Sequence, residues 1–391
     1  MDLTGDIRDY FDRMLDLPKK LQLFTDIRKY PVIDLRDIIV QLFLMPFFGM
    51  NSLLNLDRIS RKKSFKKLFK CNRKMVSSDT TIKRALDWIS VGETRLFLLS
   101  FLPFMEENKL LQKMLTPSSK FRRIGIFDGS VMGGHYHETF SLSGVVSYPI
   151  FIEDCGKRGK ELPAAYSIIE KSSDLLGELF PDLLLFDSLY FNQNVFKLVR
   201  QKNTHLLIKS SDPNFRAVLI EAEFSFDHKN EMDSDVISEK GFDSNRMCNW
   251  NIESTNGSYA GFPVSISHLT EFYPKNQESR QHAESWITTT DLTLSQDEIR
   301  EAAHLRWQIE NNVFKRLAHN AGTKKFYCKN SKAFYNMLRI FCAAMAVFDA
   351  FIQIFSRNEK KMKLLLSGIK PTWKNIFSQV EEYLEGGIFR Y

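Results

Sequence analysis

The stretch EAAHLRWQIENNVFKRLAHN, residues 301–320, has the periodicity of a helix with one buried face. Its apolar side chains recur every four positions and would form a single stripe, made of Leu305, Ile309, Val313 and Leu317. Arg306 and Glu310 lie one turn apart beside that stripe. Ser295 and Glu298 upstream fit a capping box at the start of this helix. The spacing leaves two interpretations open: a surface ion pair, or a functional acid at the edge of a buried face.

Two aspartates further upstream each follow a short apolar run. Asp128 follows the apolar residues of RIGIFDGS, residues 123–130, and Asp187 follows the run 183–186. Each aspartate would project from a strand end, and open α/β sheets bind their ligands at that edge. A single aspartate in such a place is most often a turn former or a helix cap, so only the set of three acids is informative.

Three carboxylates brought together would repel one another unless they held cations. Hard oxygen ligands suit Mg²⁺ or Mn²⁺, which keep water ligands and bind substrate phosphates. Two such ions can bind the attacking and leaving oxygens of an in-line phosphoryl displacement. Asp128, Asp187 and Glu310 therefore predict metal-dependent chemistry on a phosphodiester.

The segment RWQIENN, residues 306–312, resembles the C-terminal signature of DDE-type insertion-sequence transposases of the IS-four group. That signature is a Tyr, two residues, an Arg, three residues, a Glu, six residues and a Lys. Arg306 and Glu310 match it, whereas Ala303 takes the Tyr position and Leu317 takes the Lys position. The basic residues near that Lys position are Lys315, Arg316 and His319. The resemblance extends from about residue 35 to about residue 347.

The resemblance implies an RNase H-like fold, a mixed α/β sheet with flanking helices and a β-rich insertion before the third acid. It implies that three acids are catalytic and hold two Mg²⁺ ions, with Mn²⁺ as an alternative: Asp128, Asp187 and Glu310. It also implies cleavage of one DNA strand by a metal-activated water, then attack by the freed 3′-hydroxyl on a second phosphodiester. Arg306 and Lys315 would bind DNA. Trp286 would stack on a flipped base, although a Trp in the core of the insertion fits equally well.

Composition adds a modest bias towards nucleic acid. The chain has 391 residues and a formal net charge of +7, which favours a polyanionic partner. Its five cysteines are scattered without a paired motif, so they suit a reducing compartment and argue against a zinc site. The apolar run 337–355 contains Arg339 and Asp349, which predicts a buried helix and not a membrane span. With no signal-peptide pattern at the N-terminus, we expect a cytoplasmic protein. The resemblance implies a bacterial protein that joins the nucleoid when bound to DNA.

The chain divides into five predicted segments. These are an all-helical DNA-end-binding domain at 1–117, the first part of the catalytic domain at 118–211, a β-rich insertion at 212–284, the rest of the catalytic domain at 285–355 and a helical tail at 356–391. The partners implied by the resemblance are double-stranded DNA, both transposon terminal repeats and target, and a second copy of the chain in a synaptic complex.

Residues 58–74 carry the densest basic run of the chain and no acid. Apolar residues at helical spacing within it predict an anchored helix whose free face follows phosphates. The predicted DNA-binding residues of this run are Arg61, Lys62, Lys63, Lys66, Lys67 and Lys70. A solvated basic face without a partner is the alternative.

Two local predictions concern the surroundings of the first acid. The histidines of GGHYHET, residues 133–139, have no third ligand nearby, so a polar loop is favoured over a metal site. The run 144–169 predicts a hairpin with its turn at 155–160, and Glu153, Asp154 and Glu161 would be solvated around that turn.

Three functions follow from these residues. The leading hypothesis is an active cut-and-paste transposase, and the alternative is a catalytically inactive, transposase-derived DNA-binding protein. Cleavage of a cognate DNA end that depends on divalent ions separates these two. A plain metal-dependent nuclease is a third interpretation, and it would cleave without strand transfer.

Overall fold

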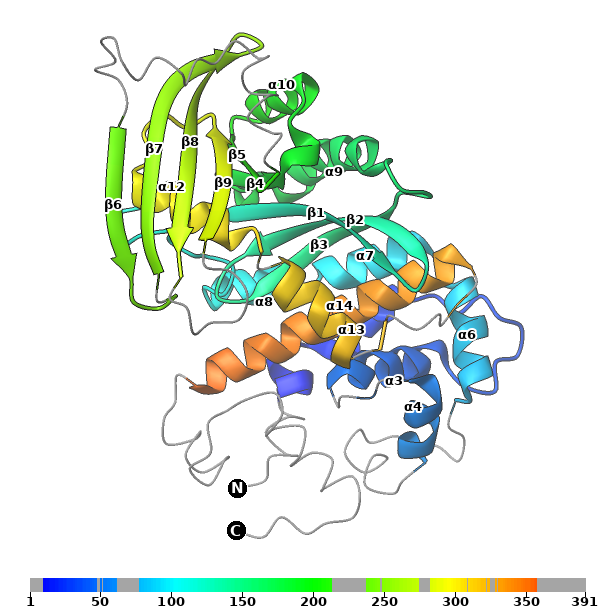
Figure 1. The fold of residues 1–391 in the computed structure, drawn as a ribbon. Helices are drawn as coiled ribbons and strands as arrows, with labels where there is room; N and C mark the ends of the chain where they lie inside the picture. The colour runs from blue at the N-terminus through cyan, green and yellow to red at the C-terminus, as the bar shows by residue number, and fades with distance from the viewer. Residues whose placement is uncertain are drawn as a thin grey trace.

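The computed structural model describes residues 10–47, 50, 52–61, 77–212, 237–246, 248–273, 282–307, 309–320, 322–323, 328 and 330–356. Within these residues the chain is a mixed α/β protein built on one nine-stranded sheet, in the order β3-β2-β1-β4-β5-β9-β8-β7-β6 (Figure 1). The strands are β1 (Ile124–Met132), β2 (His135–Ser143), β3 (Ser147–Asp154), β4 (Leu183–Asp187), β5 (His205–Ser210), β6 (Ile237–Asp243), β7 (Cys248–Tyr259), β8 (Phe262–Phe272) and β9 (His282–Thr289). The mixed sheet with its flanking helices agrees with the predicted α/β class.

The helices lie before, between and after the strands. Those before the sheet are η1 (Tyr10–Met14), α2 (Leu17–Lys20), η2 (Leu21–Leu23), α3 (Leu35–Phe47), α4 (Leu53–Ser60), α6 (Asp79–Trp88), α7 (Val91–Leu99) and α8 (Leu102–Glu107). Those between strands are α9 (Glu161–Leu176), η3 (Gly177–Leu179), η4 (Ser188–Tyr190) and α10 (Gln193–Gln201). Those after the last strand are α12 (Gln296–Leu305), η5 (Ile309–Phe314), α13 (Lys315–Asn320) and α14 (Ser331–Ser356).

Strands β1, β4 and β5 run parallel in the middle of the sheet. Residues 183–186 of β4 are fully buried, as expected for a parallel strand covered on both faces. Helices α9 and α10 pack against each other and against the strands, whereas α14 lies on the opposite side of β3 (Figure 1). The carboxyl end of β4 is therefore the edge at which an open α/β sheet would bind a ligand.

The strands from the predicted insertion continue this same sheet. Strand β9 pairs antiparallel with β5, and Trp286 lies opposite Ser210. Strands β8, β7 and β6 then follow in antiparallel order. Strand β9 corresponds to the strand predicted after the insertion, and the polar segment before it widens the central sheet by antiparallel pairing along β9.

Helix α14 is the core of the helical layer. Its residues Ser331–Ile354 are long and apolar enough to cross a membrane, with a mean hydropathy of 1.8, but 78% of that window is buried within the protein. It packs along α3, α6 and α7. The Asn336 amide donates to the carbonyl of Ile89 at 2.9 Å, and the Arg339 guanidinium donates to the carbonyl of Ile152 at 2.7 Å. The Asn336 amide is thus paired with protein, whereas Nε and Nη1 of Arg339 are buried without a hydrogen-bond partner among the described residues. The burial of most of this helix agrees with the predicted buried helix.

The predicted hairpin at 144–169 is wrong in its second half, and the predicted polar loop before it is also wrong. Residues 135–143 form β2, which is an inner strand of the sheet because it pairs with β1 on one side and β3 on the other. Residues from Glu161 onwards form α9, and the side chains that it buries recur at helical spacing: Ala165, Ile168, Ile169, Ser172 and Leu176. The β-branched and aromatic content of this run misled the prediction, because the period of burial decides the element.

Candidate active site

Asp128 and Asp187 are brought together by two parallel strands. Strands β1 and β4 pair with Ile126 opposite Leu185, and two residues further on the same register brings Asp128 level with Asp187. Asp187 is the last residue of β4, and its carboxylate accepts a hydrogen bond from the Leu189 amide at 2.8 Å. This bond caps the turn η4 that follows the strand.

Asp128 does not end its strand, contrary to the prediction. Strand β1 continues to Met132 because its antiparallel pairing with β2 continues as far as the pair Met132 and His135. Strand β4 stops at Asp187. The first acid therefore lies within a strand, at the level where the neighbouring parallel strand ends.

The two aspartates sit in an environment that resists their ionisation. Burial raises the pKa of Asp128 to about 7, the nearby Asp187 and Glu310 add to the rise, and Arg306 opposes it. Burial also raises the pKa of Asp187, against the Leu189 amide and Arg306, which lower it. Two partly buried carboxylates on neighbouring strands need a cation nearby if both are to be charged.

Arg306 lies at the junction that leads to the third acid. It is the C-cap of α12, and its Nη1 lies 3.9 Å from Oδ1 of Asp128. The predicted single helix over 301–320 is broken here into α12, the π-helix η5 and α13. A four-residue repeat drifts by about 40° per step on a regular α-helix. The wider π turn takes up this drift, and all four residues of the stripe stay buried, at 4% exposure or less.

Glu310 lies on η5 and is about half exposed. Its Oε1 lies 3.2 Å from Nζ of Lys315, with the Glu310 side chain 46% exposed. The same ammonium group donates to Oδ1 of Asn311 at 2.8 Å. An ion pair this exposed contributes little to stability, so it can open when either partner finds another ligand.

The donor set fits a divalent ion in its chemistry. Asp128 and Asp187 supply hard carboxylate oxygens, and burial is the main cause of their raised pKa values. In the part of the chain that the structure describes, no group of three or more His, Cys, Asp or Glu side chains is arranged to hold a metal ion by itself. Mg²⁺ usually binds through one or two carboxylates, with waters and substrate phosphates completing its shell. The aspartate pair meets that requirement.

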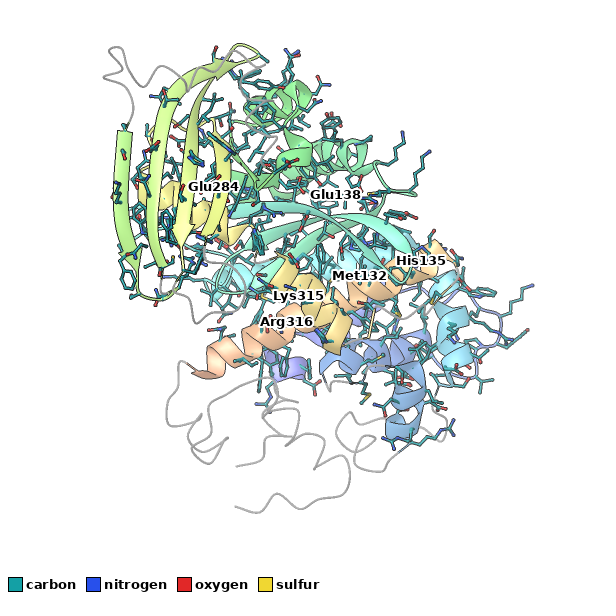
Figure 2. All side chains as sticks on the ribbon, viewed as in Figure 1. Met132, His135, Glu138, Glu284, Lys315 and Arg316 are labelled. Atoms are coloured by element: carbon teal, nitrogen blue, oxygen red, sulfur yellow. The ribbon has the colours of Figure 1, made fainter. Side chains whose placement is uncertain are left out.

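Two further acids adjoin the pair, and the sequence analysis missed their role in the site. Glu138 on β2 is fully buried, and its Oε2 accepts a hydrogen bond from the Tyr190 hydroxyl at 2.6 Å. Glu161, predicted to be solvated, has a buried Oε2 with no hydrogen-bond partner among the described residues. A Cβ at Gly129 would lie 2.9 Å from Cγ of Glu161. Figure 2 labels Glu138 in the strand layer, away from Lys315 on α13.

Lys209 is a buried cation on the other side of Asp187. The two residues are opposite each other in the parallel pairing of β4 with β5. Burial lowers the pKa of Lys209 to about 8, against the charge of Glu271 and together with Arg306. Its ammonium group lies 5.9 Å from the centre of the Trp307 ring. The sequence pattern around a buried lysine in a strand does not distinguish it from a lysine that is exposed to solvent.

The remaining predicted DNA-binding residues are spread over the molecule. Trp286 lies in the sheet at 9% exposure, with its ring stacked on His268 at 4.4 Å, which corresponds to the core alternative. Arg61 is exposed and pairs with Asp57 at 2.7 Å. The other basic residues of that run lie outside the described residues: Lys62, Lys63, Lys66, Lys67 and Lys70.

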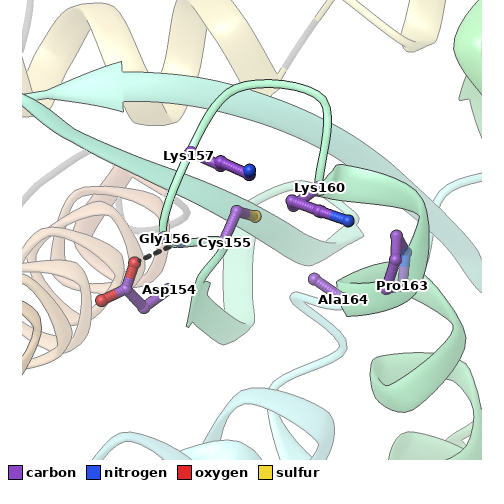
Figure 3. Close-up of a pocket in the computed structure, with 7 residues that line it drawn as sticks. All are labelled: Asp154, Cys155, Gly156, Lys157, Lys160, Pro163 and Ala164. Carbon is purple, nitrogen blue, oxygen red and sulfur yellow. Dashed lines mark hydrogen bonds between the residues drawn. The ribbon is translucent and has the colours of Figure 1, made fainter.

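An open pocket of about 600 Å³ lies on the loop between β3 and α9, which leads to Glu161 (Figure 3). Gly156 and Gly159 have φ values of +70° and +81°, which favour glycine. Lys157 and Lys160 line the pocket. The loop brings positive charge to the start of the helix that carries Glu161.

Comparison with known proteins adds little to this geometry. No protein-family description matches the chain, and no curated protein does. Among solved structures, the chain is similar to a piggyBac transposase synaptic complex with hairpin DNA, at 10% identity and a TM-score of 0.38, over 96% of this chain and 85% of that one. A likeness this weak carries no argument. What the geometry itself defines is a mixed α/β protein with a carboxylate site at the end of a parallel strand.

Proposed function

We propose that the protein is a DDE-type DNA transposase with an RNase H-like catalytic domain. It binds the terminal repeats of a transposon and catalyses strand cleavage and strand transfer. The observation that carries this proposal is the placement of Asp128 and Asp187 on neighbouring parallel strands, with Arg306 beside them. The resemblance of residues 306–312 to the transposase signature also supports it, and Arg306 belongs to both observations.

Different residues would have different roles in the proposed reaction. Asp128 and Asp187 would hold divalent ions, Mg²⁺ or Mn²⁺, with Glu310 as the third acid. When bound, such ions activate a water molecule and stabilise the leaving oxygen of the phosphodiester. The planar guanidinium of Arg306, which lies beside Asp128, would bind a DNA phosphate through paired hydrogen bonds.

The cations around this site favour a polyanionic substrate. Lys209 lies opposite Asp187 in the sheet register. Three exposed cations, Lys157, Arg158 and Lys160, occupy the loop before Glu161. A DNA strand crossing the acid site would meet positive charge on both sides, and the basic residues 58–74 would supply further phosphate contacts. Joining two transposon ends requires a synaptic complex, for which we propose a homodimer acting on nucleoid DNA in the cytoplasm.

A cleavage and joining assay tests the proposal. The substrate is double-stranded DNA carrying the repeats that flank the coding region, and the wild type is compared with Asp128→Asn and Glu310→Gln in Mg²⁺ and in Mn²⁺. We expect the wild type to cut and join, and both variants to bind DNA without cutting. Binding without cutting by the wild type would instead establish the non-catalytic DNA-binding protein. Cutting without joining would establish a nuclease, and cutting by the Glu310 variant would mean that another acid is the third ligand.

A further inference from the structure

We propose that Tyr190 and Glu138 are positioning residues, which hold the two aspartates of the site in register through one buried hydrogen bond. The bond joins the turn that follows Asp187 to strand β2, which is paired with the strand that bears Asp128. This inference rests on the proposed function, because it concerns the same carboxylate site.

The position of the hydrogen bond matters because the backbone pairing of β1 with β4 stops short of the two aspartates. The last pair of residues in that pairing is Ile126 and Leu185. Asp187 is paired on its other side with Lys209 of β5. Strand β2 stays paired with β1 from end to end. The hydrogen bond from Tyr190 to Glu138 therefore connects the two acid-bearing segments beyond the end of that backbone pairing.

Both partners are fixed by their surroundings. Tyr190 is fully buried, and its ring lies 5.2 Å from that of Phe186 on β4. Glu138 is fully buried on β2, opposite Gly129 of β1. Asp187 caps the same turn that carries Tyr190, so a movement of the tyrosine would move the turn and the carboxylate together.

A glutamate is a costly choice for packing alone. Oε1 of Glu138 is buried and has no hydrogen-bond partner among the described residues. A buried acceptor left without a partner opposes folding, and an apolar residue of similar size would avoid that cost. The presence of an acid here is explained if its second oxygen, which accepts the hydrogen bond from Tyr190, has a function at the site.

The charges around Glu138 favour its neutral form. Burial raises its pKa well above the usual range, the Tyr190 hydrogen bond lowers it, and the negative charges of Asp128, Asp187 and Glu161 raise it further. Glutamine has the same shape, and its side-chain carbonyl oxygen can accept the same hydrogen bond from Tyr190, so it should replace this glutamate.

The test uses four variants of the full chain and two measurements. Tyr190→Phe and Glu138→Leu remove the hydrogen bond, whereas Glu138→Gln keeps its acceptor. Tyr166→Phe is the matched control, because the Tyr166 hydroxyl donates to Asn192 at 3.1 Å without joining the two strands. The measurements are the Mn²⁺ dissociation constant by calorimetry and amide hydrogen exchange in residues 187–190. Circular dichroism and thermal melting identify any variant that fails to fold.

We expect Tyr190→Phe and Glu138→Leu to weaken Mn²⁺ binding by about tenfold or more, as is common when the residues that orient metal ligands are removed. Both should also exchange faster in residues 187–190, while Glu138→Gln and Tyr166→Phe behave like the wild type. A folded Tyr190→Phe that binds Mn²⁺ as tightly as the wild type would overturn the proposal.

Two other outcomes also decide against it. A Glu138→Gln variant as weak as Glu138→Leu would show that the charged carboxylate acts directly, which is not a positioning role. If Glu138→Leu fails to fold, Tyr190→Phe and Glu138→Gln still give the answer. A wild type that binds no Mn²⁺ would defeat the proposed function and this inference together, whereas equal binding by wild type and Tyr190→Phe defeats this inference alone.

Discussion

The guanidinium of Arg306 lies 3.9 Å from the carboxylate of Asp128, and Nε of the same arginine is buried without a hydrogen-bond partner among the described residues. At this distance the two groups attract each other without forming a hydrogen bond. The guanidinium therefore keeps hydrogen-bonding capacity beside the acid pair. A DNA phosphate would supply the hydrogen-bond acceptor that this arginine lacks. The counter-ions of the DNA would supply positive charge beside the partly buried acids.

Replacing Arg306 by Lys should reduce cleavage although the charge is kept. A lysine cannot form the paired hydrogen bonds of a guanidinium, and a hydrogen bond to a charged group contributes about 1.5–3 kcal/mol. We expect kcat/KM for DNA cleavage to fall by about tenfold to a hundredfold. The control is Arg122→Lys on the exposed segment before β1, which should change kcat/KM by less than about threefold, a difference below about 1 kcal/mol. Equal activity of Arg306→Lys and wild type would remove Arg306 from the site.

His137 should make the protein sensitive to acid. Burial lowers the pKa of this histidine to about 4, and neither ring nitrogen has a hydrogen-bond partner among the described residues. Between about pH 6.5 and pH 4 the unfolded chain binds a proton that the folded chain does not, so stability falls as the pH falls through this window. The largest loss from this one group is about 3 kcal/mol.

The measurement is the free energy of unfolding by urea at pH 5 and at pH 7.5. His137→Phe keeps a ring against Phe314, whose ring centre lies 5.5 Å away in the wild type. The variant should lose less stability than the wild type between the two pH values. Replacement of the exposed His319 by Gln should leave the wild-type difference unchanged, and the same result for His137→Phe would contradict the prediction.

The sequence predicts local elements of this fold better than their partners. The apolar run 183–186 and the capping box at Ser295 both appear where predicted, and Glu298 Oε2 accepts from the Ser295 amide at 3.0 Å. These features depend on neighbours in the chain. The order of strands in the sheet depends on contacts between distant parts of the chain. The sequence therefore could not reveal that the predicted insertion continues the central sheet.

The candidate site shows the same limit. Asp128 and Asp187 stand out because each follows an apolar run. Glu138 and Lys209 do not, because a polar residue in a covered strand has the same pattern as one that faces solvent. The break after Arg306 was missed because a four-residue repeat suits an α-helix almost as well as a helix with a π turn.

Arg300 should be the most sensitive charged residue of the helix that leads to the site. It is 3% exposed, and its Nη2 donates to Asp243 at 2.8 Å and to Glu271 at 3.0 Å. Removal of one partner from a buried ion network costs about 3–5 kcal/mol, because the other charges stay buried. Arg300→Met should therefore lower the free energy of unfolding by about that amount in urea titrations. Lys83→Gln, which breaks the exposed pair with Asp79, should cost less than about 0.5 kcal/mol, and similar losses for both would refute the prediction.

The basic run 58–74 should set the salt dependence of DNA binding. Each phosphate contact that is lost reduces the slope of log K against log salt by about 0.9 on double-stranded DNA. Replacing Lys62, Lys63, Lys66, Lys67 and Lys70 by Gln should therefore weaken binding and reduce the slope by up to about 4.5. A second variant controls for the change in net charge, with five exposed lysines outside the run replaced by Gln: Lys29, Lys109, Lys171, Lys197 and Lys240. The comparison requires DNA-binding isotherms at several salt concentrations for both variants. An unchanged slope in the first variant would mean that this run is a solvated face, and that the cations near Asp128 carry the contacts with DNA.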